Sequence, residues 1–171
     1  AFTQAIQLDP EKADYYLERG VSYSIIKDYD RAIADQTKAI LLDPNKTNNY
    51  YQRALTYNYK GDYDGAIADY TQAIQLDPNK ADYFIARGKI YSRKGDYSRT
   101  IADFTQAIQL RPSMAFYYDE RGLCYHNKGD YDRAIADTSK AIQLDPNKAY
   151  YYYLRGISYN EKKDYKRAIA D

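Results

Sequence analysis

Two side chains that support nucleophilic chemistry in enzymes each occur once in this chain, as Cys124 and His126. A thiol is activated when a histidine lies within hydrogen-bonding distance of it. On a helix, a spacing of two residues turns the side chains about 200° apart, so this pair cannot act together. The sequence also has no glycine-rich phosphate loop, no metal-ligand spacing and no serine–histidine–aspartate set. We therefore expect no enzymatic activity, no metal and no cofactor.

The composition narrows the classes of partner. Lys and Arg number 25 and Asp and Glu 24, for a formal charge of +1, which gives no electrostatic reason to expect nucleic acid. No apolar run approaches the roughly 18–20 residues that span a bilayer, so we expect no membrane insertion. A single cysteine excludes an internal disulfide framework and leaves the compartment open, with a slight preference for the cytoplasm.

The whole chain follows a 34-residue period. Complete repeats occupy 13–46, 47–80, 81–114 and 115–148, and no insertion interrupts them. Residues 1–12 are the tail of a preceding repeat and 149–171 the front of a fifth. The period is marked by five prolines, which are Pro10, Pro44, Pro78, Pro112 and Pro146.

Each repeat predicts two helices and a turn. Position 4 is aromatic, position 8 is Gly or Ala and position 11 is Tyr, which form one stripe of a first helix. Positions 20, 24 and 27 form one stripe of a second helix, and the small residues at 8, 20 and 27 let the helices approach closely. Gly-Asp at 61–62, 95–96 and 129–130 predicts a left-handed residue followed by a helix cap. Lys27 and Lys163 replace that glycine, at a cost on the order of 1 kcal/mol each.

An arginine and an aspartate also recur in every repeat, at positions 7 and 23. Both positions lie on the stripes that should face the interior, so we predict a ladder of partly buried ion pairs between the two helices of each repeat. The predicted pairs are Arg19–Asp35, Arg53–Asp69, Arg87–Asp103, Arg121–Asp137 and Arg155–Asp171.

This pattern resembles the tetratricopeptide repeat, and the resemblance covers the whole chain. It departs from the family at position 7, where leucine is common, and at Gln36 and Thr138, where position 24 is usually aromatic. The resemblance implies an all-α, right-handed superhelical solenoid of antiparallel helix-turn-helix hairpins, forming a single array over 1–171. It also implies a protein–protein interaction scaffold whose first helices line a concave wall that binds a peptide or a partner helix.

Positions 2, 5, 9, 12 and 13 of each first helix are expected on that wall, and the contact residues are taken from the last four of these positions. They differ between repeats although the surrounding positions are constant, which is typical of a tuned binding surface. The alternative interpretation is that some of them pack against the neighbouring first helix. Lys89 and Arg93 form a local basic spot that suits an acidic group of the ligand. The expected contact residues are Leu17, Val21, Ile25, Tyr51, Leu55, Asn58, Tyr59, Ile85, Lys89, Arg93, Asp119, Leu123, His126, Tyr153, Ile157 and Asn160.

Two specialised functions of related solenoids do not fit. The lysine and asparagine clamp that holds chaperone tails is absent, since Leu17, Val21 and Gln52 occupy three of its positions. An RNA-reading solenoid of the pentatricopeptide kind has a 35-residue period and a basic face, neither of which occurs here.

A second hypothesis concerns the ends of the array. The sequence begins and stops near position 23 of the repeat, with no polar capping helix, so we expect a piece of a longer array. Exposed ends would favour head-to-tail self-association through Ala1–Pro10 and Tyr150–Asp171. The sequence does not identify the partner protein or peptide.

Overall fold

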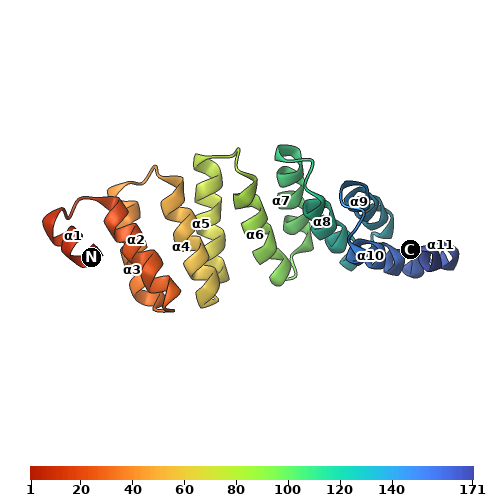
Figure 1. Cartoon of the computed structure of the whole chain (residues 1–171), viewed down its shortest axis with the longest axis horizontal. Helices are drawn as coiled ribbons and strands as arrows, with labels where there is room; N and C mark the ends of the chain where they lie inside the picture. Colours follow the sequence, from red (N-terminus) through yellow and green to blue (C-terminus); the bar gives the residue numbers. More distant parts are fainter. The chain divides into compact units, whose positions relative to one another are not determined.

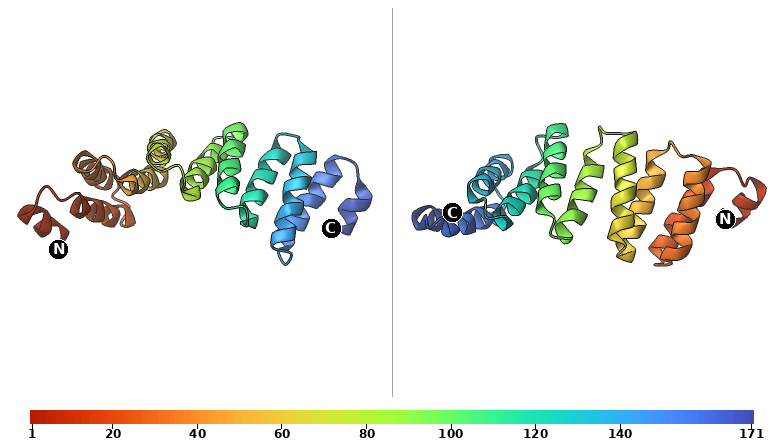
Figure 2. Two further views of the ribbon diagram at one scale, coloured as in Figure 1. Left: turned by 90° about the horizontal axis from the view of Figure 1, so that it is seen from above. Right: turned by 180° about the vertical axis from the view of Figure 1, so that it is seen from behind.

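The computed structural model describes residues 1–171 and is entirely helical (Figure 1). Successive helices pair as antiparallel hairpins (Figure 2). The helices are α1 (Phe2–Leu8), α2 (Ala13–Ile25), α3 (Tyr29–Leu42), α4 (Thr47–Lys60), α5 (Tyr63–Leu76), α6 (Ala81–Arg93), α7 (Tyr97–Leu110), α8 (Ala115–Asn127), α9 (Tyr131–Leu144), α10 (Ala149–Glu161) and α11 (Tyr165–Ala170).

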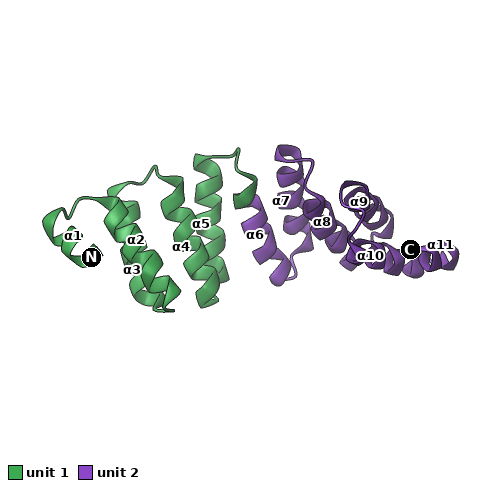
Figure 3. Cartoon of the chain, in the orientation of Figure 1, with its two compact units in different colours: residues 1–83 green, residues 84–171 purple.

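The chain divides into two compact units, residues 1–83 and 84–171, shown in green and purple in Figure 3. The boundary falls inside α6 and therefore within the third repeat. In unit 1, α3 lies between α2 and α4, and the core includes Leu17, Ala54 and Tyr70. In unit 2, α9 lies between α8 and α10, and the core includes Phe104 and Tyr151.

The turn chemistry predicted from the sequence is confirmed. Gly61, Gly95 and Gly129 have φ angles of 87°, 74° and 78°, and Lys27 and Lys163 adopt the same left-handed region at 64° and 60°. The aspartate after each of these residues caps the next helix through its carboxylate. For example, Asp62 accepts a hydrogen bond of 3.0 Å from the backbone N–H of Gly65.

Small residues bring the two helices of a repeat together. A Cβ atom added to Gly122 would lie 3.2 Å from Cβ of Asp137 and 3.3 Å from the carbonyl oxygen of Ala134, so no larger residue fits without a shift. Ala134 and Ala141, at positions 20 and 27, are fully buried. The spacing argument therefore identified the contact line between the helices correctly.

The Arg–Asp ladder is also confirmed. Arg121 donates from Nε and Nη2 to the two carboxylate oxygens of Asp137, at 2.7 and 2.8 Å, and its Nη1 donates to Oγ1 of Thr105 in the preceding second helix at 3.0 Å. The same two-pronged contact joins the other four pairs. Arg19, Arg53 and Arg155 likewise donate from Nη1 to a hydroxyl of the preceding repeat's second helix, so the ladder joins successive hairpins inside each unit.

Many tyrosines have structural roles. The hydroxyl groups of Tyr50, Tyr118 and Tyr152, all at position 4, donate to the carbonyl oxygen of the preceding repeat-marking proline at 3.0, 3.1 and 3.2 Å. Such a bond fixes the link between one second helix and the next first helix. It also gives a physical reason for tyrosine over phenylalanine at this position.

Candidate partner-binding surface

We use the term variable face for the residues expected on the concave wall from positions 5, 9, 12 and 13 of the first helices. The first helices α2 and α4 carry this face in unit 1, and α8, α10 and the part of α6 from residue 84 onward carry it in unit 2. Each helix places positions 9 and 13 one turn apart on the same side, so the face runs along the helix. The buried stripe of positions 4, 8 and 11 anchors it from behind.

In unit 1 the face includes a small apolar pocket. Ile25 and Tyr59 are 76% and 63% exposed, and with Ser24, Lys27 and Tyr29 they line a cavity of about 290 Å³. The structure thus brings together two of the predicted residues from separate helices. Two large apolar side chains that remain in water beside a hollow form a surface that an apolar group of a ligand can cover.

The middle of the same face is only partly open. Val21, Leu55 and Asn58 are half-buried, and a ligand reaches one side of each. Tyr51 is also half-buried, and its ring lies 5.8 Å from the ring of Tyr70 and 5.3 Å from that of Tyr83. Burial raises the pKa of the Tyr51 hydroxyl. Leu17 is different, because it is only 3% exposed and belongs to the core.

In unit 2 the basic spot is present at the surface. Lys89 and Arg93 are exposed, and Nζ of Lys89 lies 4.7 Å from the centre of the Phe116 ring. Lys89 also acts on Glu120, whose pKa is raised by burial and held back by that positive charge. Ile85, one turn before Lys89, is half-buried. A ligand carboxylate at this place would meet a cation whose stem already packs on an aromatic ring.

Asp119 was expected on the face and is instead buried. Its Oδ1 atom is out of contact with solvent and has no hydrogen-bond partner. Burial and the neighbouring Glu120 charge raise the pKa of Asp119 to about 6, against the opposing effect of Lys148. A surface role requires access, so Asp119 and Leu17 are left out of the proposed contact set below.

Cys124 and His126, the residues considered first for nucleophilic chemistry, both make packing or hydrogen-bond contacts within the helical array. The Nδ1 atom of His126 is 3.0 Å from Oγ of Ser158, and its ring packs against Tyr131 at 5.3 Å. Cys124 is buried, and burial raises the pKa of its thiol to about 12. A thiol with that pKa is not a nucleophile near neutral pH. The side chains contain no group of three or more histidine, cysteine, aspartate or glutamate residues placed to hold a metal ion.

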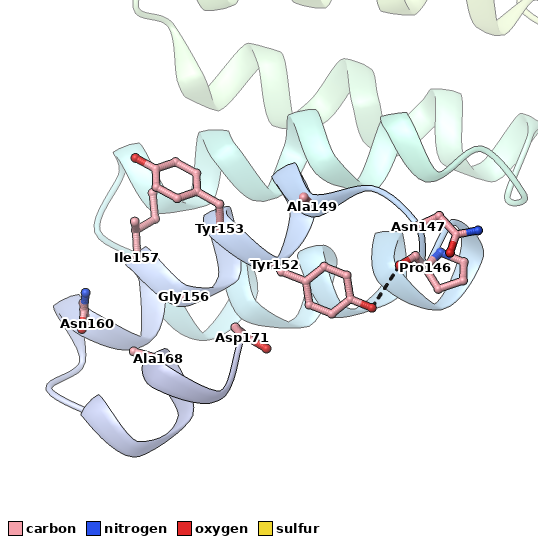
Figure 4. Close-up of a pocket in the computed structure, with 10 residues that line it drawn as sticks. All are labelled: Pro146, Asn147, Ala149, Tyr152, Tyr153, Gly156, Ile157, Asn160, Ala168 and Asp171. Carbon is pink, nitrogen blue, oxygen red and sulfur yellow. Dashed lines mark hydrogen bonds between the residues drawn. The ribbon is translucent and has the colours of Figure 1, made fainter.

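A cavity of about 710 Å³ lies in the fifth repeat (Figure 4). Three predicted residues, Tyr153, Ile157 and Asn160, line one part of it. The side chain of Tyr152 reaches back toward Pro146, and the end of α11 at Asp171 lies beside Gly156. Sequence reasoning did not single out this hollow. The signal that points to it is the pair of small lining residues at positions 8 and 20, Gly156 and Ala168.

Sequence models of a known family match these helical repeats. Sequence models described as "Tetratricopeptide repeat" match residues 13–46, 81–114 and 120–148, and a model described as "TPR repeat" matches 54–95. The chain belongs to the tetratricopeptide repeat family. A search of curated protein sequences finds no match. None of the helices has the length and hydropathy of a membrane span.

Solved structures of other tetratricopeptide proteins have the same helical-repeat solenoid fold. YrrB, described as a TPR protein with an unusual peptide-binding site, is 25% identical, with a TM-score of 0.85 over 99% of this chain and 88% of YrrB. MamA is 25% identical, with a TM-score of 0.87 over 94% of this chain and 88% of MamA. MamA from Desulfovibrio magneticus RS-1 is 21% identical, with a TM-score of 0.83 over 92% of this chain and 89% of its own, and shows the fold alone.

Proposed function

We propose that this tetratricopeptide protein is a non-catalytic scaffold that binds a peptide or a partner helix along its variable face. The observation that carries the proposal is the contrast between constant, buried scaffold positions and varying face positions that leave Ile25, Tyr59 and Tyr153 largely in water. The scaffold positions are fixed by packing, whereas exposed apolar residues at the face have no packing role. The peptide-binding site described for YrrB supports the same function for this chain.

The proposed contact set contains the accessible members of the variable face. In unit 1 an apolar side chain of the ligand would enter the pocket between Ile25 and Tyr59. In unit 2 an acidic group would pair with Lys89 and Arg93. Apolar anchors supply affinity and the charge supplies orientation, which is the usual division in peptide grooves. The full set is Val21, Ile25, Tyr51, Leu55, Asn58, Tyr59, Ile85, Lys89, Arg93, Leu123, His126, Tyr153, Ile157 and Asn160.

A selection from a displayed peptide library tests this function. Peptides that bind the immobilised chain would be measured against three variants by fluorescence polarisation. Ile25→Lys and Tyr59→Lys place a charge in the unit 1 pocket, and both side chains are exposed enough for the fold to tolerate the change. The control is Leu41→Lys, because Leu41 is equally exposed but lies on the second helix α3.

We expect the two face variants to weaken binding by at least about tenfold, the equivalent of losing one good apolar contact. The control variant should bind as the wild type does. Equal binding by all four proteins would contradict the proposal, and loss of binding only in Leu41→Lys would move the site to the second helices.

Self-association through the ends is a second candidate function. The observation in its favour is that large apolar side chains of α1 and α11 lie in water, with Leu8 82% and Ile169 86% exposed. It uses different residues from the unit 1 pocket, so the two functions are separable by mutation.

A further inference from the structure

Two adjacent acidic residues of α8, Asp119 and Glu120, have no hydrogen-bond partner in the chain. The Oδ1 atom of Asp119 is buried and accepts no hydrogen bond, and Glu120 is half-buried. Lys148 acts on Asp119 and Lys89 acts on Glu120 through their charges, without a hydrogen bond. A carboxylate withdrawn from water without such a bond is unfavourable, and groups of this kind are concentrated at functional sites. The pair therefore has unused capacity for a positively charged partner.

The side of α8 that carries Glu120 also carries Phe116 one turn before it and Cys124 one turn after it. Nζ of Lys89 lies over the Phe116 ring, 4.7 Å from its centre, so this cation is engaged one turn before Glu120. The negative charge of Glu120 still reaches the buried Cys124, where it adds to the effect of burial in raising the pKa of the thiol. Lys89 therefore neutralises Glu120 only in part.

Across from α8, the ring of Tyr150 on α10 borders the same acidic pair. Tyr150 is 45% exposed, and the charges of Asp119 and Glu120 add to the effect of burial in raising the pKa of its hydroxyl. The faces of aromatic rings attract cations. Two carboxylates with the Phe116 ring on one side and the Tyr150 ring on another therefore favour an organic cation over an apolar or acidic group.

We propose that Glu120 is a specificity-determining residue of unit 2 and accepts a lysine or arginine side chain of the bound peptide. It lies one residue after position 5, outside the contact set given above. The cationic group pairs with the Glu120 carboxylate, whereas Asp119 acts from the buried side through its negative charge and does not touch the ligand. The inference rests on peptide binding at the variable face and specifies the chemistry of the peptide.

The neighbouring basic spot gives the ligand a second charge. Lys89 and Arg93 are exposed on α6, the first helix before α8, and suit an acidic group. A ligand with acidic groups alone would bring a negative charge close to the unpaired Glu120 and be repelled by it. A basic and an acidic residue at neighbouring places satisfy both sites and fix the direction in which the peptide lies along the face.

The displayed-library selection tests the inference when it is repeated on Glu120→Gln. This change keeps the shape of the side chain and removes its charge, and no hydrogen bond is lost because Glu120 accepts none. The matched control is Glu18→Gln, since Glu18 is exposed and occupies the same repeat position in α2. Peptides recovered with the wild type and with Glu18→Gln should be enriched in lysine or arginine at one place. That enrichment should disappear with Glu120→Gln, and circular dichroism checks its helix content.

A double-mutant cycle on one selected peptide measures the size of the effect. At pH 7.5, Glu120→Gln should weaken binding about tenfold or more in fluorescence polarisation, as should replacement of the enriched basic residue of the peptide by glutamine. The two changes together should weaken binding no more than either alone. Asp119 has a pKa of about 6 and is charged at this pH, so Asp119→Asn should weaken the basic peptide by a smaller factor and leave the glutamine peptide unaffected.

Three results would overturn the role of Glu120: recovered peptides with no basic preference, the same preference with Glu120→Gln, or an equal loss of affinity in Glu18→Gln. The last would show an effect of net charge alone. Peptides that lose affinity in Tyr59→Lys yet show no basic preference would keep binding on the variable face and remove only this role. A selection that recovers no peptide would contradict the proposed function itself. The two failures are therefore distinguishable.

Discussion

Removal of Asp137 from the Arg–Asp ladder should lower the free energy of unfolding far more than removal of Arg133, a member of an exposed ion pair on the same helix. In Asp137→Ala, Arg121 loses two charge-assisted hydrogen bonds of 2.7 and 2.8 Å and keeps only Thr105 as a polar partner. The Arg121 and Asp137 side chains are 17% and 11% exposed, so water replaces the lost bonds only in part. An unpaired buried charge costs roughly 3–5 kcal/mol, and the residual exposure favours the lower end, about 3 kcal/mol.

The matched control lies on the same helix. Arg133 pairs with Asp130, and these side chains are 66% and 28% exposed. Arg133→Ala should leave the unfolding midpoint nearly unchanged, because an exposed pair contributes little to stability. Asp130 itself is kept, since its carboxylate caps α9.

Urea unfolding followed by circular dichroism measures the difference. A loss of about 3 kcal/mol corresponds to a midpoint lower by about 1 M or more for a chain of this size. The double variant Arg121→Met/Asp137→Leu should recover most of the loss, because no unpaired charge remains. Equal midpoints for Asp137→Ala and Arg133→Ala would refute the argument that burial makes the Arg121–Asp137 pair contribute more to stability than an exposed pair.

Three further predictions concern single sites. Asp119 has a folded-state pKa of about 6, above its unfolded value, so stability should fall as pH rises from about 4 to 6; Asp119→Asn should remove this dependence and gain up to about 3 kcal/mol at pH 7.5 in urea titrations. Lys27→Gly should raise the unfolding midpoint by the equivalent of about 0.5–1 kcal/mol, because glycine adopts the φ of 64° without strain; a lower midpoint would show that the turn is unstrained. Cys124 should react with a thiol reagent only after urea unfolding, and rapid labelling of the folded chain would contradict its burial.

The pH prediction depends on which charges surround Asp119. The negative charge of Glu120 raises the pKa of Asp119, and the positive charge of Lys148 lowers it. Glu120 itself has a pKa raised by burial, and its ionised form raises the pKa of Asp119. The Asp119→Asn and wild-type curves should therefore converge near pH 4, where Asp119 is protonated in the folded state. Parallel curves across the range would show that Asp119 ionises as freely in the folded chain as in the unfolded one.

The helical hairpins and their internal contacts were predictable because they depend on spacing alone. A 34-residue period with small residues at positions 8, 20 and 27 fixes which faces meet, and the arginine and aspartate follow from the same stripes. The left-handed turns at Gly61 and Lys27 follow from glycine's conformational freedom and from its replacement. Each of these predictions concerns contacts within one repeat or with its immediate neighbour.

The exposure of the variable face was less predictable, because it depends on how the next first helix crosses. Leu17 and Tyr153 both occupy position 5, yet Leu17 is 3% exposed and Tyr153 is 64% exposed. In unit 1, α4 contacts α2 beside Leu17's helix face. Position in the repeat specifies the direction of a side chain, and the neighbouring hairpin decides whether that side is covered. For the same reason, the burial of Asp119 emerged only from the structure.

Site-specific photocrosslinking tests the central claim, ligand binding on the variable face, most directly. A photoreactive amino acid would replace Tyr59 in one protein and Leu41 in another, both of which are exposed, and each would be irradiated with a library-selected peptide. The account predicts that the peptide crosslinks to position 59 and not to position 41, and that unlabelled peptide competes the product away. Crosslinking at position 41 alone, or equal crosslinking at both positions, would contradict it.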